Sequence, residues 1–93
     1  MRNLNYTNGF ARDFKRELKG RYKDSLDDLI QEAVKYLAND TPLPKRYVDH
    51  PLSGEWKDCR DCHLKPDLVL IYRKPNDTDL EFLRIGSHSE LEL

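Results

Sequence analysis

An apolar stripe along residues 26–37 restricts the fold of this chain more than any other feature. Aliphatic side chains recur there with the spacing of one face of an α-helix, at Leu26, Leu29, Ile30, Ala33, Val34 and Leu37. Ser25 is a good N-cap before the stripe, and Asn39 and Pro42 are stop signals after it. We therefore predict an amphipathic helix that must bury this face against another layer of structure.

A shorter helical pattern precedes this stripe. Large apolar side chains recur every four residues at Phe10, Phe14, Leu18 and Tyr22. Residues 3–7 predict a short strand before it, and the side of the helix that carries Asp13 and Arg16 is expected to face solvent. Because few residues separate the two helical patterns, we predict an antiparallel helical hairpin.

The C-terminal half of the chain has the pattern of β-strands. Residues 68–72 (LVLIY) form a continuous apolar run, which is typical of a buried central strand. Residues 55–64 alternate, with Trp56 as an expected core residue, and residues 80–85 form a last strand. Short turns that contain proline separate the three segments, so we predict an antiparallel meander.

The predicted order is strand, helix, helix and three strands. It indicates an α+β fold with two layers, in which the N-terminal helical hairpin packs on a small antiparallel sheet. A chain of 93 residues is long enough for one such domain, residues 1–93, and too short for two.

Charge and composition limit the classes of function. The formal net charge is −1, from 16 basic and 17 acidic residues, which argues weakly against nucleic-acid binding. Glu90 and Glu92 lie in the last five residues, so the rest of the chain carries +1 and can still present a local basic surface. No signal peptide is recognisable, and no segment approaches the ~20 apolar residues of a membrane span. We therefore expect a cytoplasmic protein.

Cysteines and a histidine stand together in the segment Cys59-Arg60-Asp61-Cys62-His63, which matches the attachment pattern of c-type haem. We reject haem because the expected strand points residues 59 and 62 to opposite faces and because Met1 is the only methionine available as an axial ligand. The same opposition argues against a disulfide or a shared metal. We expect one buried thiol and one exposed thiol.

The three histidines of the chain, His50, His63 and His88, all fall at the ends of expected elements, where functional side chains collect. Asp67 follows His63 in a turn. Imidazoles titrate near neutral pH, so paired histidines can act as general base and general acid. From spacing alone, an ordinary polar loop residue is still the commoner explanation for each of them.

The histidines and Asp67 fit general acid–base catalysis, since the sequence has no nucleophile elbow, P-loop or metal signature that would indicate another reaction type. RNA suits this set because its own 2′-OH is the nucleophile. A base deprotonates that hydroxyl, a cation stabilises charge on the phosphate, and an acid protonates the 5′-oxygen. The candidate phosphate-binding cations are Lys57, Arg60 and Arg84, which lie on expected strands. Ordinary solvent-exposed strand residues are an equally good explanation for all three.

Several short motifs follow one another in a specific order. They are Asp49-His50-Pro51-Leu52, Gly54-x-Trp56-Lys57, Arg60-x-x-His63-x-x-Pro66-Asp67, Leu70-Ile71-Tyr72 and Arg84-x-Gly86-Ser87-His88. In this order, over most of residues 43–91, the chain resembles the YafQ branch of the RelE/ParE toxin superfamily.

The resemblance implies a RelE-like fold and a bacterial toxin of a type II toxin–antitoxin system. Such toxins are endoribonucleases that cut mRNA in the ribosomal A site and need no metal or other cofactor. A cognate antitoxin neutralises them, and the complex binds operator DNA and represses its own operon. The resemblance also makes His50 the general base and His88 the general acid, with His63 and Asp67 positioning or polarising the substrate.

Two departures from the family pattern stand out. The family tail carries an aromatic residue four positions after the last histidine, and this chain has Glu92 there. An aromatic ring can stack on a base, whereas a carboxylate repels phosphate. We therefore expect weaker cleavage than from a chain that ends in phenylalanine. The low net charge is the second departure, since relatives are usually basic.

Two other functions stay open at this point. One is a non-catalytic toxin of the same fold, either a gyrase poison or a protein that only holds an antitoxin and operator DNA. Gyrase-poison members lack the histidine set, which favours the nuclease. The other is a small metal-binding protein that uses the histidines and Cys62, which a zinc titration would test.

Overall fold

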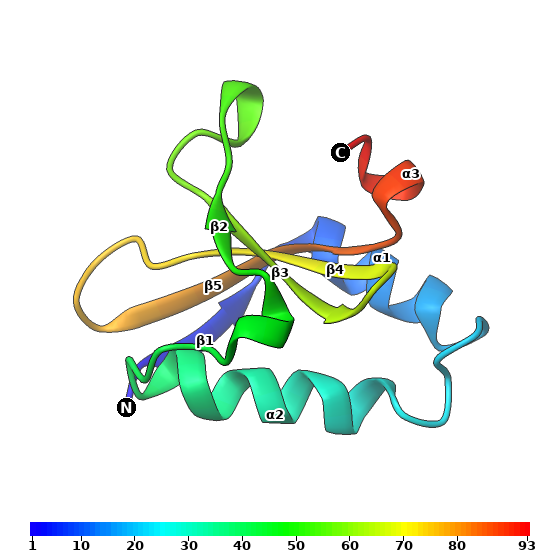
Figure 1. Ribbon diagram of the computed structural model, residues 1–93, viewed down its shortest axis with the longest axis horizontal. Coiled ribbons are helices and arrows are strands. Elements are labelled where there is room, and N and C mark those ends of the chain that lie inside the picture. The colour runs from blue at the N-terminus through cyan, green and yellow to red at the C-terminus, as the bar shows by residue number, and fades with distance from the viewer.

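One sheet of five strands organises the computed structural model, which describes residues 1–93. The strands are β1 (Asn3–Tyr6), β2 (His50–Pro51), β3 (Arg60–Lys65), β4 (Leu68–Arg73) and β5 (Asp79–Gly86). Their order in the sheet is β1-β5-β4-β3-β2 (Figure 1). β1 pairs with β5 in parallel, and the other neighbours are antiparallel. The predicted meander with a central, buried β4 is confirmed, and the short β2 extends it at one edge.

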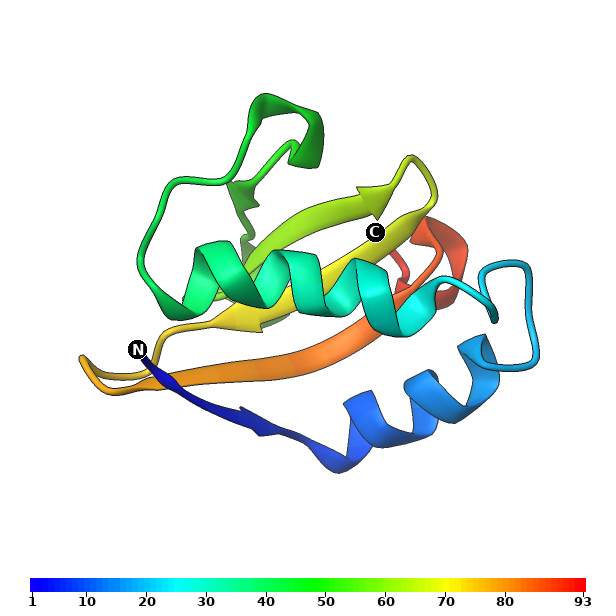
Figure 2. The same cartoon turned by 90° about the horizontal axis from the view of Figure 1, so that it is seen from below.

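Three α-helices accompany the sheet: α1 (Asn8–Glu17), α2 (Leu26–Ala38) and α3 (His88–Leu91). Two 3-10 turns, η1 (Lys45–Tyr47) and η2 (Gly54–Trp56), lie in the segments around β2. α2 crosses one face of the sheet, and α1 runs beside the β1–β5 edge (Figure 2). This arrangement confirms the predicted α+β fold class. None of the helices combines the length and the apolar character that a membrane span requires.

The main core lies between α2 and the sheet. The apolar stripe of α2 packs there as its spacing predicted, through Leu26, Ile30, Ala33 and Leu37. The strands supply Cys62, Leu64, Leu68, Leu70, Tyr72, Leu80, Phe82 and Ile85. A smaller cluster of Cys59, Val69, Ile71 and Leu91 lies on the other face of the sheet. This second cluster is where the C-terminal helix α3 is anchored.

α1 is shorter than its apolar spacing predicted. The Thr7 hydroxyl caps it by accepting a hydrogen bond from Phe10 N at 3.0 Å, and the helix ends at Glu17. Leu18 is therefore exposed, although Tyr22 still packs against the main core from the following turn. The predicted helical hairpin is an open one, because a groove lined by both helices lies between α1 and α2.

The predicted strand over residues 55–64 is wrong in its first half. Gly54 has a φ of +67° and opens the turn η2, and Asp58 has a φ of +73°, which breaks any extended run. β3 starts only at Arg60. Trp56 is half-buried against the smaller cluster rather than anchored in the main core, and Lys57 follows η2 in a loop instead of lying on a strand.

The two cysteines point to opposite faces of the sheet, as predicted. Cys62 belongs to the main core and Cys59 to the smaller cluster. The expectation that one thiol is exposed is wrong, because Cys59 is only 5% exposed. The loop before β3 and helix α3 cover the second face there. Burial raises the pKa of both thiols, so both are protonated at neutral pH.

Candidate active site

The face of the sheet opposite α2 carries the predicted catalytic residues. Alternation along β3 turns Cys62 toward α2 and turns Asp61 and His63 toward the opposite face. Pairing across the strands places one row of residues there, His50, Asp61, Ile71 and Arg84, and a second row, His63, Val69 and Gly86. Segments far apart in the sequence therefore meet on one surface.

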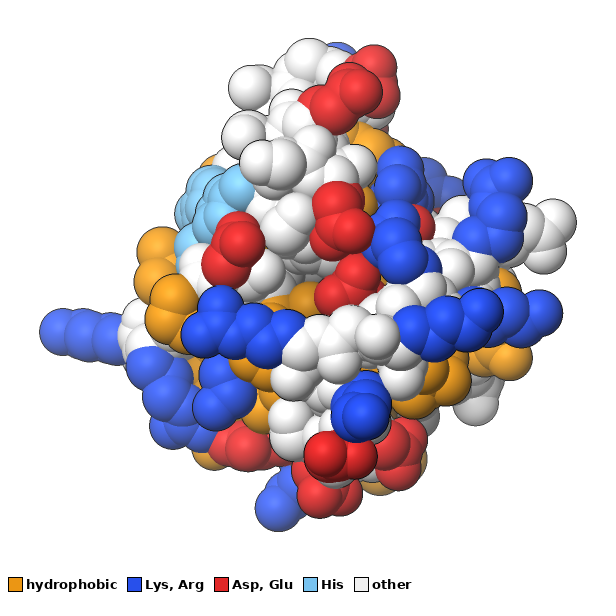
Figure 3. Space-filling model, turned by 90° about the vertical axis from the view of Figure 1, so that its right-hand side faces the viewer, with side chains coloured by type: hydrophobic (Ala, Val, Ile, Leu, Met, Phe, Trp, Pro, Cys, Tyr) orange, Lys and Arg blue, Asp and Glu red, His pale blue; other side chains and the backbone are white.

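All three imidazoles gather on this surface. The ring centroids of His50 and His63 are 6.5 Å apart, and those of His63 and His88 are 5.0 Å apart. His50 and His88 can be no further apart than these two distances together, well inside the ~15 Å beyond which they could not serve one phosphate. Figure 3 views the molecule from the side and shows histidine side chains as one pale-blue patch, with lysine and arginine side chains lower on the side that it presents.

His88 is held in place by Asp67 and by the start of α3. Ser87 and Glu90 form a capping box, in which the Ser87 hydroxyl accepts from Glu90 N at 3.1 Å and Ser87 N donates to Glu90 Oε1 at 2.9 Å. The Asp67 carboxylate receives both the backbone N–H and the Nδ1 of His88, at 3.2 and 3.0 Å. These hydrogen bonds lower the pKa of Asp67, which keeps it ionised beside the imidazole.

His50 has a fixed orientation as well. Its Nδ1 lies 2.8 Å from the Val48 carbonyl oxygen and 2.9 Å from Asp61 Oδ1. A carbonyl oxygen can only accept a hydrogen bond, so Nδ1 carries the proton. In the neutral ring the free lone pair is therefore on Nε2. This is the tautomer that a general base requires.

Asp61 is the functional residue that our sequence reasoning missed. Its side chain points at His50 and is only 3% exposed, and its Oδ1 accepts no hydrogen bond. Burial raises the pKa of Asp61, and the three nearby histidines act in the opposite direction. A signal was available in the sequence, because residues 61 and 63 of a strand share a face.

Arg84 lies on the histidine face but is tied to helix α1. Its Nε and Nη2 donate to the carboxylate of Asp13 at 2.5 and 3.2 Å, and this pairing raises the pKa of Arg84. Asp13 is 3% exposed and also accepts from Arg16 and from Ile85 N, so the expectation that it faces solvent is wrong. A guanidinium has five N–H donors, so Arg84 keeps donors for a substrate while its position is fixed.

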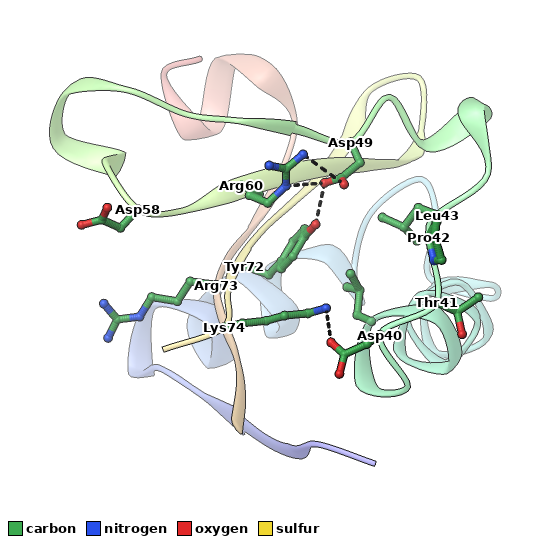
Figure 4. A pocket seen from close by; sticks show the side chains of 11 residues that line it. Asp40, Thr41, Pro42, Leu43, Asp49, Asp58, Arg60, Tyr72, Arg73 and Lys74 are labelled. Atoms are coloured by element: carbon green, nitrogen blue, oxygen red, sulfur yellow. Dashed lines mark hydrogen bonds and ion pairs between the residues drawn. The ribbon is translucent and has the colours of Figure 1, made fainter. Parts of the chain in front are cut away.

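Arg60 lies on the other face of the sheet, away from the histidines. Its guanidinium donates to both carboxylate oxygens of Asp49 at 3.2 Å, and the Tyr72 hydroxyl donates to Asp49 at 2.5 Å (Figure 4). These groups line a hollow beside the end of α2, with Lys74 paired to Asp40 at 2.7 Å. Of the three cations proposed from sequence, only Arg84 lies on the histidine face by strand register.

Glu92 follows α3 and is exposed, with a φ of +59° that ends the helix. Leu91 before it is buried in the smaller cluster and anchors this end of the chain. The Glu92 carboxylate is one of the charges that raise the pKa of Arg84, so it lies within electrostatic range of that guanidinium. A negative charge therefore stands near the one predicted cation of the histidine face.

No group of three or more His, Cys, Asp and Glu side chains is arranged to hold a metal ion. Cys62, the thiol of the metal site that the sequence left open, points into the main core on the opposite side of the sheet. The arrangement instead offers two oriented imidazoles, each with a carboxylate beside Nδ1, and a third imidazole between them.

Comparison with known proteins places this geometry in a family. Residues 2–93 match the family described as "Bacterial toxin of type II toxin-antitoxin system, YafQ". This chain belongs to the YafQ family. The mRNA interferase toxin YafQ of Escherichia coli K12 is 42% identical over 91 residues, which cover 97% of this chain and 95% of that protein. Its name agrees with the enzyme class that the motifs predicted.

Solved toxin structures share the fold. The E. coli DinJ-YafQ toxin-antitoxin complex contains a chain 41% identical to this one, with a TM-score of 0.81 and coverage of 97% of this chain and 96% of that chain. A copper-bound mutant toxin from Helicobacter pylori is 40% identical, with a TM-score of 0.85 and coverage of 98% and 99%. The predicted family, fold class and toxin function are therefore confirmed.

Proposed function

We propose that this YafQ-family chain is an mRNA interferase, a cytoplasmic endoribonuclease that cuts mRNA in the ribosomal A site without a metal. Support comes from the E. coli relative that carries this name and from three imidazoles within reach of one phosphate. The observation that carries the proposal is the orientation of His50 and His88 by acceptors at their Nδ1 atoms.

His50 is the general base in this proposal. With the proton on Nδ1, its Nε2 takes the proton of the 2′-OH, and the 2′-oxygen attacks the adjacent phosphorus. Asp61 is a positioning residue, since it touches His50 rather than the substrate. Its carboxylate stabilises the imidazolium that forms when His50 accepts the proton.

His88 is the general acid. Its Nδ1 points to the ionised carboxylate of Asp67, which stabilises the protonated imidazole and leaves Nε2–H to donate. As the bond between phosphorus and the 5′-oxygen breaks, that proton passes to the leaving oxygen. The products are a 2′,3′-cyclic phosphate and a 5′-hydroxyl. The protons return through solvent.

His63 and Arg84 stabilise the phosphate. His63 lies between the other two imidazoles, where an N–H can contact a non-bridging oxygen of the phosphate. The Asp13 pairing holds Arg84 on the same face with donors to spare. Both donors are already in position before the reaction, so no free energy is spent on reorienting them as charge develops on the phosphate.

A cognate antitoxin is the protein partner in this proposal, by analogy with the DinJ-YafQ toxin-antitoxin complex. Binding of operator DNA would occur through the toxin–antitoxin complex rather than through this chain alone. The net charge of −1 fits a toxin without a broad basic surface for DNA.

Cleavage of mRNA by programmed ribosomes tests the proposal. The parent chain, His50→Ala and His88→Ala are compared at saturating toxin, with Lys35→Gln on the exposed side of α2 as the matched control. We expect both histidine variants to lose at least about 100-fold in rate, the usual contribution of one general acid or base. A histidine variant that cuts as fast as the control removes that residue from the mechanism. A parent that cuts nothing favours the non-catalytic toxin.

A further inference from the structure

A second hollow adjoins the histidine patch, at the edge of β3 that β2 leaves unpaired. β2 pairs only with residues 60 and 61, and the turn η1 packs beside the remainder of β3. The hollow has a volume of about 440 Å³ and is lined by His63 and Lys65 of β3, by Arg46 and Val48, and by Glu32 of α2. His63 is thus a wall of this hollow and a member of the catalytic group.

We propose that this hollow binds one nucleotide of the RNA next to the scissile phosphate. The inference rests on the proposed function, because His63 has to face both the phosphate under attack and its neighbour. The volume falls within the range of about 300–1,000 Å³ that small-molecule sites occupy. The remaining evidence is the chemistry of the two sides of the hollow.

One side offers a flat surface for a base. The Arg46 guanidinium lies over the ring of Tyr47, with 4.9 Å between the guanidinium carbon and the ring centroid, and the side chain is 62% exposed. Its free face is therefore available to stack on a base, which is how arginine planes bind single-stranded RNA. Val48, 54% exposed, adds an apolar surface next to it while its carbonyl holds His50.

The other side offers a charge for a phosphate. Lys65 is exposed and takes part in none of the ion pairs of the structure, whereas Arg46 is already paired with Glu32. The Glu32 carboxylate repels phosphate, so the phosphate belongs on the Lys65 side and the base over Arg46. Such a division gives the nucleotide one orientation in the hollow.

The hollow in Figure 4 lacks this division. Each of its cations has a carboxylate partner: Arg60 has Asp49, Lys74 has Asp40 and Arg73 has Glu81. A phosphate would have to displace one of these ion pairs to bind there. None of the three histidines lines this hollow.

NMR of the full chain locates the nucleotide. The probe is a three-nucleotide RNA with 2′-O-methyl groups, which cannot be cut, titrated to millimolar concentration. We expect the backbone amide signals of Val48, His63 and Lys65 to shift together. Arg46→Ala weakens binding about 5- to 100-fold, the usual effect of losing one stacked base, and Arg46→Lys weakens it similarly because the charge stays while the plane is lost. No shifts at these three residues would overturn the proposal.

Ribosome-dependent cleavage separates this proposal from the proposed function. Lys65→Gln and Arg46→Ala should raise KM and leave kcat near that of the parent, whereas His50→Ala lowers kcat. Lys65→Gln should also change how the Kd of the three-nucleotide RNA depends on salt. The slope of log Kd against log salt concentration should be smaller than that of the parent by about 0.7, the value for one phosphate of a single strand. If the parent cuts and both variants keep its KM, the subsite is wrong and the nuclease stands. If the parent does not cut, the nuclease itself is wrong, and the subsite falls with it.

Discussion

Asp13 is expected to be the most important single carboxylate for stability. Replacing it with alanine leaves the buried Ile85 N–H without an acceptor, which costs about 1–3 kcal/mol. It also removes ion pairs to Arg84 and Arg16, whose side chains are 31% and 40% exposed, so solvent screening limits each to about 0.5–1 kcal/mol. The free energy of unfolding should therefore fall by about 2–5 kcal/mol. For a chain of this length the melting temperature should fall by at least about 8 °C.

Urea unfolding followed by far-UV circular dichroism measures this loss. Asp24→Ala is the matched control, because Asp24 is an exposed turn residue and its replacement should change stability by less than about 0.5 kcal/mol. Asp13→Asn keeps one acceptor for Ile85 N and should lie between the two. If Asp13→Ala unfolds within about 0.5 kcal/mol of the control, the burial of this carboxylate does not have the energetic role argued for it.

Three further predictions concern the site and its surroundings. Asp61→Asn should lower kcat while leaving KM unchanged and should alter the acidic limb of the pH–rate profile, because the imidazolium of His50 loses its anion; an unchanged profile would contradict the positioning role. Burial raises the pKa of Cys59 and Cys62, so both thiols should stay protonated at pH 8 and react with a disulfide reagent only after unfolding; fast labelling of the native chain would show that one is exposed. Glu92→Phe should speed ribosome-dependent cleavage, since it removes a carboxylate within electrostatic range of Arg84, the arginine proposed to contact the phosphate, and adds a stacking ring; equal rates would mean that the tail is not involved.

Local patterns predicted much of this fold. The stripe of α2 and the apolar run of β4 each satisfy a short-range periodicity, and both elements formed where that periodicity placed them. β3 was placed five residues too early because Asp58 adopts a positive φ, which no alternation of side chains reveals.

The sequence predicted the three histidines of the site and one of its carboxylates, Asp67, but not Asp61 or Asp13. The motif resemblance gave His50, His63 and His88 together, and the sheet brings them together as required. Asp13 escaped because its role depends on residues distant in sequence, 71 residues away in its pairing with Arg84. Asp61 could have been inferred from the strand face that it shares with His63. The capping-box pattern Ser-x-x-Glu after β5 indicates the start of a helix, and we did not use it to predict α3.

The chemistry of the cut itself tests the central claim most directly. The measurement compares ribosomes programmed with an all-ribose mRNA and with one that carries a single 2′-deoxy nucleotide on the 5′ side of the scissile bond. If the 2′-oxygen is the nucleophile, the all-ribose mRNA should yield a 2′,3′-cyclic phosphate and a 5′-hydroxyl, and the deoxy mRNA should stay intact at that position. Cleavage of the deoxy mRNA at a similar rate would contradict the account, because His50 would then have no hydroxyl to deprotonate.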